Sequence, residues 1–464
     1  MTPEKQIEEQ AANPLPRYND VPPVRFGEHD DFDREIIADN IIKLLDSDLT
    51  DCYPMAIDGG WGTGKSEFCH KLINKMRDNA ANYKTRNVIY FDAFEAENVE
   101  EPLLSLLAKI TEVVPESEKE SLRSKIAPVV RYGLKITLKG LVSHTLRQNA
   151  DDIADGLRET IEEESKTIID GLLKEYSQAK ANVDALKKCI ENAVVQKELV
   201  IFVDELDRCR PDFALNVFEL VKHVFDIEGV KFIFVINSNQ IKAMISHRYG
   251  HDVETDVYLE KFIKFSITLP RITSKYQEFN VSARYYELEL LKLQKKHLVG
   301  RRNYAYQFIS DFIKNKNISL RGVEKLSFSI KLYTELCPTR HLNSPIGDLG
   351  WSLFTVAGIL IFTFDKNLSE KIIKNTASKN DIYEFFGVES RKTDIDNWSV
   401  IQLMSEILAF ETVPSHLKDV EYTHDQQNNI QTKIKQLFEV RYSPPREGIL
   451  TILIDIIQTL NFCG

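Results

Sequence analysis

A glycine-rich loop between a short apolar run and a helical stretch constrains this chain more than any other feature. Residues 54–72 read PMAIDGGWGTGKSEFCHKL, and four of the 19 glycines fall within six residues, at 59, 60, 62 and 64. Glycines let a loop wrap closely around phosphates so that successive backbone N–H groups point at them. The N-terminus of the following helix adds a favourable dipole. The stretch therefore predicts a polyphosphate site.

The residues of this loop follow the pattern G-x-x-x-x-G-K-[ST] of nucleoside-triphosphate-binding proteins. In that pattern Lys65 reaches the β- and γ-phosphates, where it also serves catalysis, and the Ser66 hydroxyl ligates Mg²⁺. A glycine-rich turn with a chance lysine is the alternative, which the position between a strand and a helix disfavours. The residues expected to contact the nucleotide are Gly59, Gly60, Trp61, Gly62, Thr63, Gly64, Lys65, Ser66 and Glu67.

Apolar runs alternate with helical periodicity along the first part of the chain, which favours an α/β fold. Strands are expected at 54–58, 87–94, 199–205, 231–237 and 264–270. The prediction is a P-loop NTPase with a central parallel five-stranded sheet, in which the acidic strand does not follow the phosphate-loop strand directly in sequence. We expect a polar lead-in (1–26), the NTPase core (27–275) with a helical insert at about 100–197, and a mostly helical C-terminal region (276–464).

The strand at 199–205 ends in acids, in the sequence LVIFVDELDR. Ligands of open α/β sheets bind at the carboxyl ends of the strands, so Asp204 is the candidate for the second Mg²⁺ ligand. Glu205 is the candidate general base that polarises an attacking water, with Asp207 as the other candidate. The alternative is that Glu205 and Asp207 only cap the next helix. Asn237, after the fourth strand, is the candidate sensor of the γ-phosphate.

Four arginines are candidates for a cationic finger that neutralises charge in the transition state, in cis or from a neighbouring subunit. For each of them the alternative is a surface or interface ion pair. Trp61 is expected to pack on the sheet edge rather than stack on a base. The arginines are Arg208, Arg210, Arg271 and Arg321.

Three motifs, GGWGTGKS, FDAFEAE at 91–97 and IFVDELDRCRPD at 201–212, resemble the KAP family of P-loop NTPases, which includes phage-exclusion proteins. The resemblance covers roughly residues 25–330. The chain departs from it at Asp204-Glu205, where a double Asp is usual, and at Phe94, where a tryptophan is usual. Neither departure touches the residues that surround the phosphates.

The resemblance implies ATP as the nucleotide, hydrolysed with Mg²⁺, in a molecular switch or motor of bacterial antiphage defence. It implies a homo-oligomer, effector proteins encoded nearby, or both. The alternative is a nucleotide-gated scaffold or membrane-associated signalling protein with little turnover. The absence of separate effector chemistry, such as a nuclease-like carboxylate cluster, leaves this alternative open.

The charge distribution bears on partners. The net charge of −11 disfavours attraction of the whole molecule to nucleic acid. Residues 121–147, however, contain six basic residues and no acid. This basic segment is a candidate contact for nucleic acid, a membrane surface or an acidic protein. The alternative is a solvated basic face.

The compartment follows from two observations. Six scattered cysteines without a C-x-x-C pair favour a reducing compartment, the cytoplasm. Residues 349–364 are uncharged over 16 residues, but a membrane-spanning helix needs about 20. We therefore expect a buried core helix there and no integral membrane segment.

Overall fold

The computed structural model describes residues 20–27, 32, 34–47, 51–79, 85–98, 102–126, 128–129, 180–270, 272–273, 279–294, 304–337, 349–388, 398–438 and 448–462. The chain divides into two compact units. The first comprises residues 1–30 and 34–269, and the second comprises residues 31–33 and 270–464. Each unit has its own core, and the two are described in turn.

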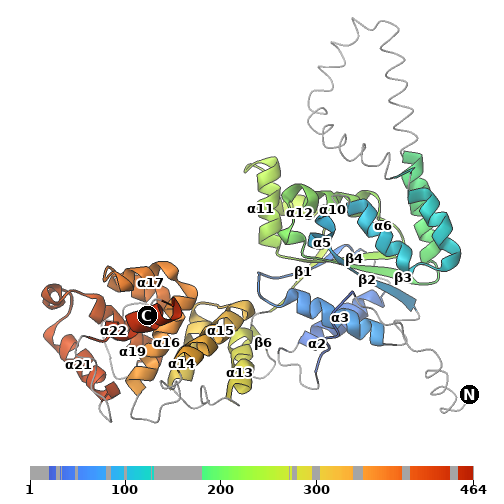
Figure 1. Cartoon of the computed structure of the whole chain (residues 1–464). Coiled ribbons are helices and arrows are strands. Elements are labelled where there is room, and N and C mark those ends of the chain that lie inside the picture. The colour runs from blue at the N-terminus through green and yellow to red at the C-terminus, as the bar shows by residue number, and fades with distance from the viewer. Residues whose placement is uncertain are drawn as a thin grey trace, which may run out of the picture. The chain divides into compact units, whose positions relative to one another are not determined.

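The first unit is built on a five-stranded parallel sheet (Figure 1). Its strands are β1 (Met55–Asp58), β2 (Arg86–Asp92), β3 (Glu198–Asp204), β4 (Val230–Ile236) and β5 (Phe265–Thr268). Their order is β2-β3-β4-β1-β5, and all four pairings are parallel. The predicted α/β fold with a central parallel five-stranded sheet is therefore confirmed. Since β4 lies between β1 and β3, the phosphate loop and the acidic residues emerge from strands that are not neighbours.

Helices cover both faces of this sheet (Figure 1). Helices α2 (Arg34–Leu45) and α3 (Lys65–Asp78) share one core with alternate strand residues such as Met55 and Ile57. Ala56, between those two, faces the other core, which holds α6 (Pro102–Val113), α10 (Pro211–His223) and α11 (Ser238–Tyr249). Side chains alternate between the faces of a strand, so strands buried on both sides read as continuous apolar runs.

Short elements complete the carboxyl edge of the sheet. The helix α5 (Ala93–Glu97) follows β2 there, and the 3₁₀ turn η1 (Leu206–Arg208) follows β3. The helix α12 (Thr255–Leu259) precedes β5 and therefore leads into the amino end of that strand. Phe94 is 48% exposed at the start of α5. Helix α5 and the turn η1 thus lie at the carboxyl edge, to which the predicted site belongs.

The insert is described only at its two ends. Residues 116–126 and 180–194 are helical, and Leu122, Leu186 and Ile190 are buried in the core on the α6 side of the sheet. Residues 130–179 of the predicted helical insert lie outside the described residues. The same holds for the basic segment beyond residue 129.

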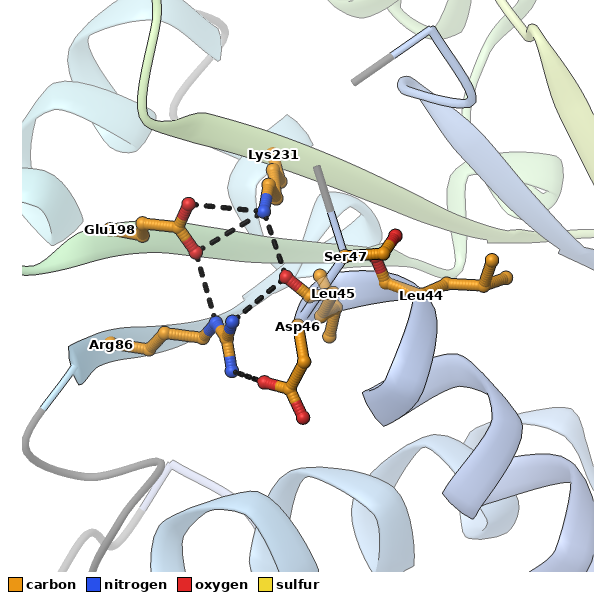
Figure 2. Close-up of polar contacts among 7 residues, drawn as sticks. All are labelled: Leu44, Leu45, Asp46, Ser47, Arg86, Glu198 and Lys231. Carbon is orange, nitrogen blue, oxygen red and sulfur yellow. Dashed lines mark hydrogen bonds and ion pairs between the residues drawn. The ribbon is translucent and has the colours of Figure 1, made fainter. Parts of the chain in front are cut away.

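A cluster of ion pairs links β2, β3 and β4 at the opposite, amino edge of the sheet (Figure 2). The Arg86 guanidinium, on β2, pairs with Glu198 on β3 at 3.0 Å and with Asp46 at 2.5 Å. Lys231, on β4, pairs with Glu198 at 3.1 Å. Both cations also donate to the Leu45 carbonyl, at 2.8 and 3.0 Å, where the C-terminus of α2 favours positive charge. This cluster fixes the sheet at the edge away from the predicted site.

The elements described in the second unit are helices, apart from a small pairing of β6 (Ile272–Thr273) with β7 (Phe279–Asn280). The helices are α13 (Val281–Gln294), α14 (Tyr304–Asn315), α15 (Leu320–Leu336), α16 (Leu349–Phe364), α17 (Lys366–Ile373), α18 (Lys379–Phe386), α19 (Val400–Thr412), α20 (Lys418–Glu421), α21 (His424–Phe438) and α22 (Leu450–Leu460), with a 3₁₀ turn η4 (Ser415–Leu417) before α20.

Helix α16 is the buried helix predicted at 349–364. Its glycines allow close packing, since a Cβ on Gly350 would lie 2.7 Å from the Phe438 ring and one on Gly358 would lie 3.0 Å from Ile456. Within the described residues, no helix has the length and apolar character needed to cross a membrane.

Candidate functional site

The phosphate loop follows β1 at the carboxyl edge of the sheet, and hydrogen bonds to β4 and within the loop hold its backbone. The Gly59 amide donates to the Ile236 carbonyl of β4 at 3.1 Å. The Thr63 hydroxyl donates to the Gly60 carbonyl at 2.8 Å. Gly62 and Gly64 have φ of 72° and 81°, a left-handed conformation that glycine adopts without steric cost. Glycine is therefore required at these two positions by the backbone itself.

Lys65 begins α3 and is only 8% exposed. Its ammonium donates to the Gly59 carbonyl at 2.7 Å and to the Gly60 carbonyl at 3.3 Å. Burial lowers its pKa, while the nearby charges of Asp207 and Asp204 raise it. The ammonium thus lies against the loop that the sequence assigns to phosphate.

Asp204, at the end of β3, is 1% exposed. Burial, with the neighbouring charge of Glu205, raises its pKa to about 7, although hydrogen bonds from the Glu205 amide and the Ser66 hydroxyl lower it. The Glu205 amide donates to Asp204 Oδ1 at 2.8 Å, and the Tyr90 hydroxyl donates to Oδ2 at 3.3 Å. A buried carboxylate with these neighbours is stabilised by a cation.

The donor set fits magnesium. Ser66 and Asp204 supply a hydroxyl and a carboxylate, the hard oxygen ligands that Mg²⁺ prefers. Among the described residues, no group of three or more His, Cys, Asp or Glu side chains could hold a metal by itself. Mg²⁺ usually takes only one or two carboxylates and completes its shell with water and phosphate oxygens. That Ser66 and Asp204 are its ligands remains a prediction, which rests on the chemistry of these donors.

Glu205 lies between the phosphate loop and the turn after β3. Its backbone has φ of 59°, which is uncommon for a residue other than glycine and is typical of functional sites. Its Oε1 receives a long contact of 3.5 Å from the Ser66 hydroxyl, and its Oε2 pairs with Arg208. Burial raises its pKa, and the Arg208 charge opposes this. This position is compatible with the predicted general base.

Asp207 lies in η1 and is 3% exposed. Its Oδ2 accepts a hydrogen bond of 2.7 Å from the indole N–H of Trp61. The Trp61 side chain itself is half exposed, at 52%. The loop tryptophan therefore contacts the acidic turn through its polar atom.

Comparison with protein families agrees with this geometry. The model of the KAP family P-loop domain matches residues 34–337, well over half of the chain. The chain belongs to the KAP family of P-loop NTPases. Membership of this family indicates that the site takes a nucleotide, usually with a divalent cation, and the resemblance stated from the sequence motifs is confirmed.

One relative is the "Phage T7 exclusion protein" of Escherichia coli (strain K12), which is 25% identical over 272 residues. The matched region is 54% of this chain and 34% of that protein. The chain therefore spans about a third of the length of this relative.

The other predicted nucleotide contacts of the KAP domain lie around the loop. Asn237 is the N-cap of α11 and directly follows Ile236, whose carbonyl receives the first N–H of the loop. Glu67 is exposed on α3 and pairs with Lys71 at 2.7 Å. A contact of either residue with the nucleotide remains a prediction.

The four candidate arginines lie in different places. Arg208 pairs with Glu205. Arg210 is exposed and pairs with Glu97 at 3.1 Å. Arg321, near the start of α15, belongs to the second unit, and Arg271 lies outside the described residues. Among those of the four that the structure describes, Arg208 is the one that pairs with the candidate base, Glu205.

Three further residues support the site and were not predicted from the sequence. The Arg34 guanidinium donates to the Thr63 carbonyl at 2.8 Å. Asp58, at the end of β1, accepts bonds of 2.8 Å from the amide and the hydroxyl of Ser238. Tyr90 reaches Asp204 from β2. Asp58 could have been found from its place directly before the loop, but nothing in the sequence near Arg34 or Tyr90 indicates a role.

Replacing Arg34 by glutamine should weaken nucleotide binding about 10- to 100-fold, because a charged hydrogen bond to the loop contributes about 1.5–3 kcal/mol. Arg34 is 5% exposed and fixes the carbonyl of Thr63 in the middle of the KAP phosphate loop. Equilibrium titration of the folded protein with a fluorescent ATP analogue measures the change. Arg25→Gln, which removes an exposed pair with Asp78, is the control. Equal affinities of Arg34→Gln and wild type contradict the prediction.

Proposed function

We propose that this KAP protein binds ATP with Mg²⁺ and hydrolyses its terminal phosphoanhydride bond, acting as a molecular switch or motor. The observation that carries this proposal is that the phosphate loop lies in contact with the acidic residues at the end of β3. The Ser66 hydroxyl of the loop lies 3.5 Å from Glu205 Oε1, and the Glu205 amide donates to Asp204 Oδ1 at 2.8 Å. The groups needed for phosphate binding, metal binding and water activation thus converge at one edge of the sheet.

The chemistry assigned to each residue follows from its position. Lys65 binds the β- and γ-phosphates, and Ser66 and Asp204 hold Mg²⁺. When bound, the metal neutralises negative charge on the phosphate oxygens. Glu205 accepts a proton from water as the water oxygen bonds to the γ-phosphorus and the bond to the bridging oxygen breaks, which gives ADP and phosphate. A raised pKa makes its carboxylate a better base near neutral pH.

The biological role proposed is bacterial antiphage defence in the cytoplasm. Support comes from the relative named a phage exclusion protein, although only a third of that protein is matched. Hydrolysis would drive a rearrangement of the second unit, within a homo-oligomer or with effector proteins encoded nearby. The basic segment at 121–147 is a candidate contact for nucleic acid in this role.

A nucleotide-gated scaffold or membrane-associated signalling protein with little turnover is the second candidate. One observation favours it: the Glu205 carboxylate is paired with Arg208. A base held in an ion pair is less available to accept a proton from water. Under this alternative, ATP binding would order an interface and hydrolysis would be slow.

The two candidates differ in one measurable quantity, the rate of ATP turnover. Turnover should be measured over a range of protein concentrations, with Mg²⁺ or with EDTA, and with or without duplex and single-stranded DNA. We expect turnover that requires Mg²⁺ and increases per molecule with protein concentration if an arginine acts across an oligomer interface. ATP binding without turnover under all these conditions would instead favour the scaffold.

A further inference from the structure

Trp61 and Asp207 make a contact to which the reaction described above assigns no role. The indole N–H lies 2.7 Å from Asp207 Oδ2. Asp207 is 3% exposed, and a buried carboxylate needs hydrogen-bond donors to offset its lost hydration. The Trp61 ring contributes such a donor even though half of its surface is exposed. The contact therefore joins the tip of the phosphate loop to a buried acid 146 residues later in the chain.

The element that carries Asp207 also sets the position of Glu205. Glu205 precedes η1 in a left-handed conformation. The amides of Arg208 and Cys209 close the turn by donating to the carbonyls of Glu205 and Leu206, at 3.1 and 3.3 Å. Because this turn is short and closed by its own bonds, moving Asp207 moves Glu205. Fixing Asp207 against the loop therefore also fixes the Glu205 carboxylate, whose Oε1 lies 3.5 Å from the Ser66 hydroxyl.

This geometry separates two possible roles of Asp207. A general base must be free to accept a proton from water. In Asp207 the oxygen Oδ2 already accepts a hydrogen bond from the Trp61 indole. A positioning residue needs only an acceptor oxygen, which an asparagine amide also provides.

We infer that Trp61 and Asp207 are positioning residues: the indole N–H anchors the acidic turn 205–208 to the phosphate loop and so holds Glu205 in place for catalysis. The catalytic part of this inference rests on the ATP hydrolysis proposed above. The anchoring part does not, because it concerns the protein without nucleotide.

The anchoring is tested by hydrogen–deuterium exchange of the full chain without nucleotide. Trp61→Phe keeps an aromatic ring and removes the donor. We expect the peptide covering residues 205–209 to exchange about tenfold faster in this variant, which matches the loss of one hydrogen bond to a charged group. Trp351→Phe, a tryptophan change in the second unit, should leave this peptide unchanged. Equal exchange in Trp61→Phe and wild type overturns the inference.

The catalytic part is tested by the kinetics of ATP turnover. Trp61→Phe and Asp207→Ala should each lower kcat about tenfold with KM within about threefold of wild type, and the double variant should be no worse than Asp207→Ala. Asp207→Asn should keep kcat within about threefold of wild type, because its amide oxygen still accepts the indole N–H.

The outcomes are distinct. A Trp61→Phe variant with wild-type kcat overturns the positioning role, and an Asp207→Asn variant as inactive as Asp207→Ala overturns it in favour of Asp207 as the base. A wild-type protein without turnover refutes the proposed hydrolysis, and the exchange measurement still decides the anchoring.

Discussion

Lys65→Ala should lower the affinity for ATP by at least about a hundredfold and abolish turnover, because the charged bonds of the ammonium to phosphates contribute about 3 kcal/mol or more. In the described structure this ammonium lies against the carbonyls of Gly59 and Gly60, inside the loop. The variant keeps the glycines and the start of α3. Titration with a fluorescent ATP analogue measures the affinity, and phosphate release measures the turnover.

A matched control lies on the same helix. Lys71 pairs with Glu67 on the surface of α3, so Lys71→Ala removes a lysine of the same helix without touching the loop carbonyls. It should bind ATP within about threefold of wild type, as expected when a surface ion pair is lost. If Lys65→Ala binds ATP as well as Lys71→Ala does, the phosphate-binding role of Lys65 is wrong.

Glu205→Gln should lower kcat by about 10²–10⁴-fold, the contribution typical of a general base, while ATP remains bound. The amide has the size of the carboxylate and still accepts the Ser66 contact, but it cannot take a proton from water. The change also removes the ion pair with Arg208. Single-turnover measurements with bound ATP separate the chemical step from binding.

The control for this variant is at the other end of the same strand. Glu198 begins β3 and joins Arg86 and Lys231 at the amino edge (Figure 2). Glu198→Gln weakens these pairs and should lower the free energy of unfolding, without changing kcat below the unfolding temperature. A Glu205→Gln variant that hydrolyses ATP at the wild-type rate would show that another group is the base.

Local sequence signals determined most of the fold of the first unit. Runs such as residues 199–205 must be buried on both faces, because consecutive apolar side chains point to opposite sides of a strand. The same run ends in Asp204 and Glu205, and parallel strands bring such ends to one edge. The loop motif identifies its own function because close approach to phosphate needs glycines at fixed places. These inferences needed only neighbours in the chain.

Tertiary structure alone decided which distant side chains meet. Arg34 contacts the loop carbonyl of Thr63, and Trp61 contacts Asp207, 146 residues away. Arg208 pairs with Glu205, whereas its position in the sequence was also compatible with an arginine finger. Side-chain hydrogen bonds act over about 3 Å, so their partners depend on how helices and turns pack in space. The sequence by itself determined the nucleotide site and the sheet that carries it, whereas the contacts that hold its loop and its candidate base came only from the folded chain.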